Sequence, residues 1–567
     1  MGNVLIEKHV AIPMRDGVLT YADVYRPADG AVVPGLVTRT PYDKEVGLGG
    51  LPVVPSPQKL AERGYAVVMV DTRGRFSSQG EFTPFVDEGR DGYDTVEWAA
   101  AQPWCDGSIG IYGPSYLGAT TLLAARECPP ALRCAIPIIT ADDYYDGWVY
   151  QGGAYQLGFG TLWGMGLAAA QYLRAEHGLD LAYAETLAAA LQGAPASLAA
   201  LPLERVGGFA DAAPWWRDWL DHDRRDEYWE ALRPSADYAR FAVPMLHVGG
   251  WFDIFGIGTV RNFRGLTAAG RAEQQLIMGP WAHTSYDRYL GEMNFGPTGA
   301  AAFSGVIGAY NQFFDRHLKG RGADGPAVRY FVMGANEWRT AGEWPPAGAT
   351  ARAFYLHGAG SANSARGNGA LTHDRPAGSE PPDRYLYDPL RPVPTEGGPT
   401  LQAQVGLPGP RDQRAIEARD DVLCYTTEPL AQPLTVAGPV TVTIWAITDA
   451  PDTDWTAKLV DVLPDGRAVS LTDGIIRARF RDSLSDPSPV TPGEPARYTI
   501  ELANTAHRFG RGHRVRLEVS SSNFPRFQPN PNTGRPAASE TAPRPAVQHV
   551  LHDGDRPSCL ELWVLPE

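Results

Sequence analysis

The sequence carries no excess of positive charge and no long apolar run. Its 567 residues have a formal net charge of −15, so neither nucleic acid nor an anionic membrane surface is an expected partner. No window reaches 18 uninterrupted apolar residues, which argues against a transmembrane helix and a membrane partner. The N-terminus lacks the basic start and apolar run of a secretory signal. We therefore expect a cytoplasmic protein.

Cysteine is scarce, and histidine shows no metal-binding spacing. The five cysteines form no Cys-x-x-Cys pair, which favours reduced thiols over a disulfide framework or a zinc site. The twelve histidines include no His-Glu-x-x-His motif, so we expect no metal. Neither residue type points to metal-dependent chemistry.

The pattern along the chain predicts three domains, because 567 residues exceed one hydrophobic core. Residues 1–144 and 241–348 alternate short aliphatic runs with helical patterns, as in a mostly parallel sheet with crossover helices. Residues 145–240 are rich in Ala, Leu and Trp without strand-like runs, which predicts an inserted helical cap. From 349 to 567, short alternating strands predict an all-β sandwich or jelly roll.

The expected elements have the following ranges. A hairpin of Val4–Ile12 and Leu19–Tyr25 is followed by sheet strands at Pro34–Arg39, Ala66–Asp71, Ile109–Gly113, Ala135–Ile139, Val243–Val248, Gln275–Met278 and Val328–Met333. Helices are expected at 87–101, Leu162–Leu173, Tyr183–Leu191 and Phe303–Leu318, and later strands include Val440–Thr448, Trp455–Val462 and Arg514–Ser520.

The stretch G-I-Y-G-P-S-Y-L-G contains a candidate nucleophile, Ser115. It stands between a predicted strand and a predicted helix, where hydrolases with a Gly-x-Ser-x-Gly motif expose their serine. Gly113 fits that motif, but Leu117 occupies the second glycine position and Gly118 comes one residue late. The stretch alone therefore does not establish a catalytic serine.

A serine nucleophile needs a base and an acid that orients the base. Asp253 follows the predicted strand Val243–Val248, and His283 follows the next strand. The order Ser, Asp, His is that of enzymes with this sheet. Two rivals fit less well. Asp71 precedes the serine and is expected as a solvated or Arg-paired carboxylate, and His247 lies inside a strand as a core histidine.

The negative charge that develops on an attacked carbonyl oxygen needs hydrogen-bond donors. The backbone N–H of Tyr116 follows Ser115 at the start of a helix and is one candidate. The loop R-T-P-Y-D-K offers no Gly-Gly run, but the hydroxyl of Tyr42, fixed by Pro41, could donate instead. The alternative is that Tyr42 is simply half buried on its loop.

Several motifs together resemble the bacterial cocaine esterase family. They include T-P-Y-D-K, D-T-R-G-R-F-S-S-Q-G-E-F, G-P-S-Y-L-G, G-G-W-F-D-I-F, G-P-W-A-H and S-S-S-N-F-P-R, and they extend from about Ile12 to Pro525. These CocE/NonD-type serine hydrolases belong to the X-Pro dipeptidyl-peptidase and α-amino-acid ester hydrolase group. The group characteristically has Gly-x-Ser-Tyr-x-Gly at its nucleophile, which accounts for the late glycine.

The resemblance implies an α/β-hydrolase domain with an inserted helical cap and a C-terminal jelly roll. It also implies a triad of Ser115, His283 and Asp253, an oxyanion hole of Tyr42 and Tyr116, an acyl-enzyme, and no cofactor. The expected substrate is a small-molecule ester or amide with a small apolar or aromatic acyl group. The residues placed to contribute to an acyl pocket are Trp148, Phe159, Trp163 and Phe255.

Alternatives remain open at this point. Gln402 and Ala403 stand where the family closes its pocket with apolar residues, which argues against a benzoyl-type preference. X-Pro dipeptidyl-peptidase or α-amino-acid ester hydrolase activity needs a partner for an amine, and Asp142, Asp143 and Asp146 are acidic candidates near the cap entrance. A non-catalytic binding protein is a third interpretation. Exposed jelly-roll edges are compatible with a homodimer.

Overall fold

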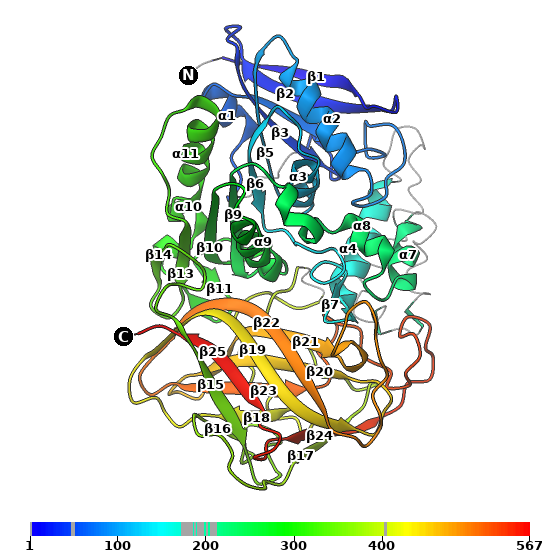
Figure 1. Ribbon diagram of the computed structural model, residues 1–567, viewed down its shortest axis with the longest axis vertical. Coiled ribbons are helices and arrows are strands. Elements are labelled where there is room, and N and C mark those ends of the chain that lie inside the picture. Colours follow the sequence, from blue (N-terminus) through cyan, green and yellow to red (C-terminus); the bar gives the residue numbers. More distant parts are fainter. Residues whose placement is uncertain are drawn as a thin grey trace.

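A ten-stranded sheet forms the centre of the upper part of the molecule (Figure 1). This is a computed structural model, and it describes residues 3–46, 52–171, 213–401 and 405–566 with isolated positions between 172 and 212. The strand order is β1-β2-β4-β3-β5-β6-β9-β10-β13-β14. Seven consecutive strands from β4 to β13 run parallel, while β1, β2 and β14 are antiparallel at the edges.

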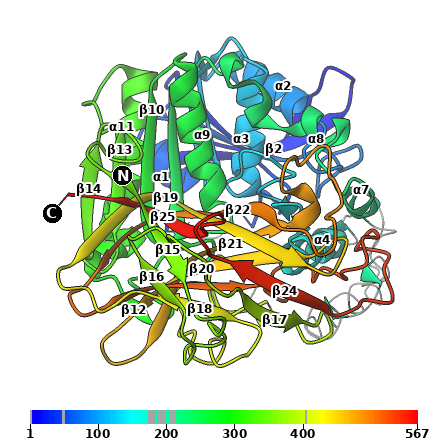
Figure 2. The same cartoon turned by 60° about the horizontal axis from the view of Figure 1, so that its bottom comes forward.

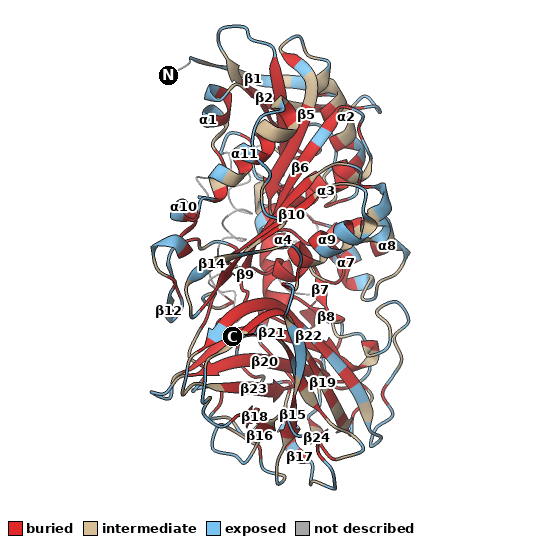
Figure 3. Ribbon diagram, turned by 60° about the vertical axis from the view of Figure 1, so that its left-hand side comes forward, coloured by how far each residue is buried: buried red, intermediate tan, exposed pale blue. Residues whose placement is uncertain are grey.

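The strands of this sheet agree with the aliphatic runs of the sequence. Their bounds are β1 Val4–Pro13, β2 Leu19–Pro27, β3 Val33–Thr40, β4 Ala66–Asp71, β5 Cys105–Pro114, β6 Leu132–Ile138, β9 Met245–Phe252, β10 Gln274–Ala282, β13 Val328–Val332 and β14 Glu337–Ala341. Parallel strands covered on both faces read as continuous apolar runs. Figure 3 shows the central strands of this sheet as mostly buried.

Helices cover both faces of the sheet. The cores place α1 (Pro57–Glu62) and α11 (Val306–Lys319) on one face, and α2 (Glu88–Ala100), α3 (Tyr116–Arg126) and the end of α9 (Gly256–Ala269) on the other. The helix expected at Phe303–Leu318 is divided into α10 (Ala301–Ser304) and α11, because Gly305 takes a left-handed φ of 79° between them.

The cap lies beside the carboxyl ends of these strands. Its helices are α4 (Leu157–Gln171), α7 (Trp215–Asp221) and α8 (Glu227–Leu232), followed by a 3₁₀ segment at Pro234–Arg240. The predicted helix Leu162–Leu173 is thus present as α4, whereas almost all of Tyr183–Leu191 lies outside the described residues.

The region predicted as a helical cap also contains a short strand pair that the sequence did not indicate. A two-residue pair, β7 (Tyr150–Gln151) and β8 (Ala154–Tyr155), precedes α4. The turn between them is Gly152-Gly153, with φ of 54° and 78°. Such a Gly-Gly turn is itself a hairpin signal, but the strands are too short to show alternation.

The C-terminal part is a mostly antiparallel β-sandwich, drawn in the foreground of Figure 2, in which only the short pair of β16 and β18 is parallel among the described strands. Ten of its strands follow the order β17-β24-β19-β25-β15-β16-β18-β23-β20-β21, and β22 pairs with β19. The bounds are β15 Thr350–His357, β16 Ala370–Thr372, β17 Asp383–Tyr387, β18 Leu423–Thr426, β19 Leu434–Thr448, β20 Asp454–Val462, β21 Ala468–Arg477, β22 Ala496–Phe509, β23 Arg514–Ser520, β24 Ala546–Leu551 and β25 Cys559–Val564. A separate two-stranded pair, β11 (Tyr289–Leu290) and β12 (Met293–Asn294), lies between β10 and β13 along the chain.

The sandwich supports the cap through specific contacts. The Gly158 N–H at the start of α4 donates to the Pro525 carbonyl at 2.9 Å. Arg261 on α9 pairs with Asp146 of the cap at 3.0 Å and with Glu501 of β22 at 2.5 Å. Cap, central sheet and sandwich therefore meet at one guanidinium. No helix within the described residues has the length and apolarity to cross a membrane.

Candidate active site

Ser115 occupies a strained turn between β5 and α3. Its φ of 58° and ψ of −122° lie in a region that residues with a side chain rarely adopt. The Ser115 N–H donates to the Ile138 carbonyl of the neighbouring β6 at 2.9 Å. The strain and this anchor are what a strand-to-helix turn needs to present a serine at the end of a sheet.

The two glycines of the stretch have different close neighbours. A Cβ on Gly113 would lie 2.3 Å from the Cβ of Leu117, inside the turn itself. A Cβ on Gly118 would lie 2.8 Å from the Cβ of Thr140 and 3.0 Å from the Gly113 carbonyl oxygen. The turn therefore requires its second small residue at position 118, and this explains the departure from Gly-x-Ser-x-Gly.

We predict that Gly118→Ala destabilises the protein by about 1–3 kcal/mol, because the added methyl overpacks α3 against Thr140. Gly308→Ala on α11 is the matched control, since a Cβ there meets nothing within 4 Å. The control should stabilise its helix by up to about 1 kcal/mol. Chemical denaturation of both variants measures the difference. Equal free energies of unfolding for the two would contradict the close approach at Gly118.

The three residues proposed from chain order come together. The distance from His283 Nε2 to Ser115 Oγ is 3.0 Å, and that from His283 Nδ1 to Asp253 Oδ2 is 2.9 Å. His283 and Asp253 are 6% and 1% exposed. The other carboxylate oxygen of Asp253 accepts from the Phe255 N–H at 2.6 Å, and the Tyr286 hydroxyl donates to the His283 carbonyl at 2.6 Å. Both hydrogen bonds fix the orientation of the pair.

The two rivals lie elsewhere. His247 is buried in β9, hydrogen-bonded to Gln274, and burial lowers its pKa to about 4. It is the core histidine that its place in a strand indicates. We expected Asp71 to be solvated or paired with an arginine, but it is fully buried, and no arginine among the described residues pairs with it. Its carboxylate accepts from the Lys44 N–H and the Ser77 hydroxyl and lies 3.7 Å from the Lys44 ammonium.

Tyr42 reaches the nucleophile from the loop after β3. Its hydroxyl accepts a hydrogen bond from Trp163 Nε1 at 2.9 Å. The side chain of Ser115 lies within interaction distance of the Tyr42 hydroxyl. Burial of that hydroxyl raises the pKa of Tyr42 to about 12, although the residue as a whole is 37% exposed. Tyr42 therefore keeps its proton at neutral pH and can donate it in a hydrogen bond.

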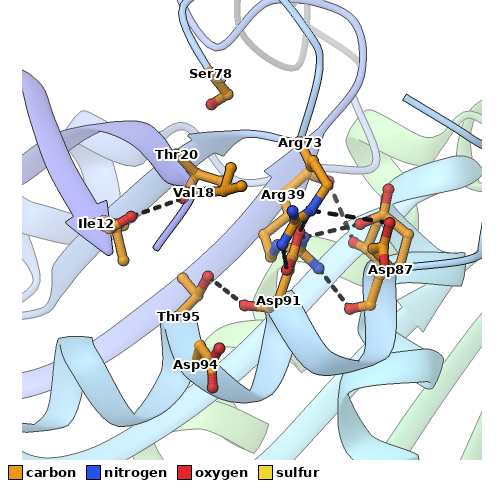
Figure 4. A network of polar contacts seen from close by, with 12 residues as sticks. Ile12, Val18, Thr20, Arg39, Arg73, Ser78, Asp87, Asp91, Asp94 and Thr95 are labelled. Atoms are coloured by element: carbon orange, nitrogen blue, oxygen red, sulfur yellow. Dashed lines mark hydrogen bonds and ion pairs between the residues drawn. The ribbon is translucent and has the colours of Figure 1, made fainter. Parts of the chain in front are cut away.

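Tyr116 is anchored by its side chain beneath the turn. Its hydroxyl donates to Glu88 Oε1 on α2 at 2.9 Å and accepts from the Phe85 N–H at 2.9 Å. Glu88 in turn pairs with Arg39 at 2.9 Å. Figure 4 shows Arg39 beside the same acidic helix, where Arg73 binds Asp91. This buried network holds the ring of Tyr116, and with it the first N–H of α3.

The four aromatic residues expected in an acyl pocket form one cluster. Trp148 and Phe255 stack with centroids 4.1 Å apart, and Phe159 and Trp163 stack at 5.8 Å. The Phe255 ring meets the edge of His283 at 5.2 Å. The cluster therefore borders the histidine of the proposed triad. Gln402 and Ala403 lie outside the described residues.

The acidic candidates near the cap entrance are used in ion pairs. Asp143 binds Arg225 at 2.5 Å, and Asp146 binds Arg261 at 3.0 Å. Asp142 is buried 3.9 Å from Arg261, and its burial raises its pKa to about 7. These pairings bind the cap to its surroundings, so Asp143 and Asp146 are already neutralised.

Sequence reasoning missed Arg75. This buried guanidinium donates to the Pro41 carbonyl at 2.9 Å and to the Leu167 carbonyl of α4 at 3.0 Å, and it lies over the Phe82 ring. It ties the Tyr42 loop to the cap. The signal was present, since Arg75 lies within the D-T-R-G-R-F motif, but no spacing rule connects it to residues 41 and 167.

Comparisons with known proteins agree with this architecture. Residues 16–285 match the X-Pro dipeptidyl-peptidase (S15) family model, and residues 321–561 match the X-Pro dipeptidyl-peptidase C-terminal non-catalytic domain. The chain is 38% identical over 576 residues to the cocaine esterase of a Rhodococcus strain, with 100% of this chain and 99% of that protein covered.

Solved structures include near matches over the whole chain. An aminopeptidase from a marine sediment Thaumarchaeota archaeon superposes with a TM-score of 0.84 at 26% identity, covering 100% of this chain and 97% of that one. An α-amino acid ester hydrolase superposes with a TM-score of 0.82 at 29% identity, covering 99% and 97%. The similarity thus extends over nearly the whole of each chain.

Proposed function

This chain belongs to the cocaine esterase and X-Pro dipeptidyl-peptidase (S15) family and is a serine ester hydrolase, and on that premise we propose that Ser115, His283 and Asp253 are its catalytic triad. The observation that carries the proposal is the pair of hydrogen bonds from Ser115 to His283 and from His283 to Asp253, at 3.0 and 2.9 Å. Such a chain is what activates a serine hydroxyl.

The proposed reaction has two steps. His283 Nε2 takes the proton of Ser115 Oγ as that oxygen bonds to the ester carbonyl carbon, and the same proton passes to the alkoxide as the carbon–oxygen bond of the ester breaks. Water then gives a proton to His283 while its oxygen attacks the acyl-enzyme, and His283 passes that proton to Ser115 Oγ as the serine–acyl bond breaks and the acid is released. In both tetrahedral intermediates the Tyr42 hydroxyl and the Tyr116 N–H would donate to the oxyanion.

The proposed substrate is an ester of a small apolar or aromatic acid. The aromatic cluster of Trp148, Phe159, Trp163 and Phe255 borders His283, and aromatic walls with few polar groups are typical of sites for such groups. Because Asp143 and Asp146 are paired with arginines, an α-amino group would find no free carboxylate on either of them. This favours a neutral acyl group over a substrate with a free amino group, such as an aminopeptidase or an α-amino acid ester hydrolase would use.

A labelling experiment tests the triad, and a substrate panel tests the acyl group. A fluorophosphonate should attach to the peptide that contains Ser115, as located by mass spectrometry. Phenyl acetate, phenyl butyrate and phenyl benzoate should be hydrolysed in preference to butyryl anilide and to Gly-Pro-anilide. A label on another serine would refute the nucleophile, and cleavage of Gly-Pro-anilide alone would replace the ester proposal with dipeptidyl-peptidase activity.

We predict that Tyr42→Phe lowers kcat by about 10²- to 10³-fold, the usual loss when one oxyanion donor is removed. The phenylalanine ring fills the same space, so KM should change little. Tyr310→Phe is the matched control, because the buried Tyr310 hydroxyl has no hydrogen-bond partner among the described residues. Steady-state kinetics on phenyl acetate measures both. A Tyr42→Phe enzyme with kcat within threefold of the parent would remove Tyr42 from the oxyanion hole.

A further inference from the structure

A chain of neighbouring polar side chains links the cap to the buried acid of the site. Trp163 Nε1 donates to the Tyr42 hydroxyl at 2.9 Å, and that hydroxyl lies beside the side chain of Ser115. Ser115 is followed by His283 at 3.0 Å and by Asp253 at 2.9 Å. The five side chains come from α4, the loop after β3, the turn before α3, and the ends of β9 and β10.

The chemistry of its two ends fixes the direction of this chain. An indole N–H can only donate a hydrogen bond, and a carboxylate can only accept one. His283 Nδ1 therefore carries a proton toward Asp253, His283 Nε2 accepts from Ser115, and the lone pairs of Ser115 Oγ remain available to a donor on the side of Tyr42. Along the triad each donor points toward Asp253, and hydrogen bonds in such a series polarise one another.

We propose that Trp163 is a positioning residue, whose indole N–H directs the Tyr42 hydroxyl toward Ser115 and so completes the oxyanion hole from the cap. This inference rests on the triad and oxyanion hole proposed above. With the indole N–H occupying a lone pair of the Tyr42 oxygen, the single hydroxyl proton is free to turn toward the reacting atoms beside Ser115. The oxyanion forms one bond away from the carbon that Ser115 attacks, so it lies within reach of this donor.

The indole is held in place from several sides. Its ring stacks on Trp219 of α7 with an interplanar angle of 4°, and it also contacts the rings of Phe159 and Tyr116. Because the N–H of Trp163 is already used by Tyr42, only the ring faces and edges of this residue remain for an acyl group. Trp163 thus has a polar role distinct from the apolar one expected from the sequence.

Arg75 gives α4 a second hold on the same loop. Its guanidinium binds the carbonyls of Pro41 and Leu167 at 2.9 and 3.0 Å. Leu167 is one turn beyond Trp163 on α4, and Pro41 directly precedes Tyr42. The backbone of the loop and the Tyr42 hydroxyl are therefore both bound to one cap helix. The position of α4 thus determines whether the Tyr42 hydroxyl is in place to donate to the oxyanion.

A double-mutant cycle tests the proposal. We expect Trp163→Phe to lower kcat for phenyl acetate about five- to tenfold, the value of one hydrogen bond. In a Tyr42→Phe background the same change should lower kcat by no more than about twofold, because the group on which Trp163 acts is gone. Any rise in KM from lost ring surface should be the same in both backgrounds. Incorporation of β-(3-benzothienyl)alanine at position 163, which replaces N–H by sulfur, should reproduce the fall in kcat without loss of ring size.

The cap contains a matched control. Trp216 Nε1 donates to the Tyr155 hydroxyl at 2.9 Å, a hydrogen bond of the same kind and length between two buried side chains of the cap. Trp216→Phe should leave kcat within twofold. Equal losses from Trp163→Phe in both Tyr42 backgrounds, or full kcat with the benzothienyl side chain, would overturn the positioning role. Failure of Ser115 to label would instead refute the triad on which the inference rests.

Discussion

Ser115→Ala is expected to lower kcat by about 10⁵- to 10⁶-fold, the loss seen when a serine nucleophile with a working base is removed. The variant should fold normally, since alanine is smaller than serine and the Ser115 N–H keeps its bond to Ile138. Residual hydrolysis above the uncatalysed rate would come from the oxyanion donors and from binding. Burst kinetics on an activated ester and fluorophosphonate labelling should both disappear.

The control for this variant lies on the same strand. Ser108 is part of β5 but far from the turn along the chain, so Ser108→Ala should keep the parent kcat and the label. If Ser115→Ala retained a tenth of the activity, another residue would have to be the nucleophile. The prediction therefore separates the geometry at the turn from any general contribution of β5.

Asp253→Asn should lower kcat by about 10⁴-fold although it changes the shape of the site very little. The amide oxygen can still accept from the Phe255 N–H, which places the NH₂ group opposite His283 Nδ1. That NH₂ group can only donate, so the imidazole must carry its proton on Nε2. A protonated Nε2 cannot take the proton of Ser115, and acylation stops.

The sandwich provides a matched control for that substitution. Asp461 forms a buried pair with His507 at 2.9 Å, with no part in the site. Asp461→Asn should therefore cost stability without lowering kcat. The rate of fluorophosphonate labelling should fall with kcat in Asp253→Asn and stay unchanged in Asp461→Asn. A loss below tenfold in Asp253→Asn would mean that His283 is oriented by something other than this carboxylate.

The strands were predictable because their signal is local. Ala66–Asp71 and Arg514–Ser520 have the predicted bounds in the structure, since burial of both faces imposes a continuous or alternating apolar pattern on the sequence itself. The break at Gly305 was missed because a glycine inside an amphipathic pattern does not reveal its φ. The periodicity of apolar residues indicates which side chains are buried. It does not indicate whether a single residue has a positive φ.

The site was predictable to the extent that chain order determines it. Ser115, Asp253 and His283 follow strands whose carboxyl ends meet, so their meeting follows from the topology. The hydrogen bond from Trp163 to Tyr42 does not follow from the topology of the sheet. It joins residues 121 positions apart through the docking of a cap helix, and sequence alone identifies Trp163 only as apolar. Arg75 was missed for the same reason.

The contacts between α4 and the sandwich have a consequence for synthesis of the chain on the ribosome. Pro525 supplies the carbonyl that holds the Gly158 N–H at the first turn of α4, and Glu501 completes the cluster around Arg261. Both residues emerge long after the nucleophile, the base and the cap have been translated. A nascent chain that already contains every proposed catalytic residue still lacks the support of its cap, so hydrolytic activity should appear only as translation nears its end.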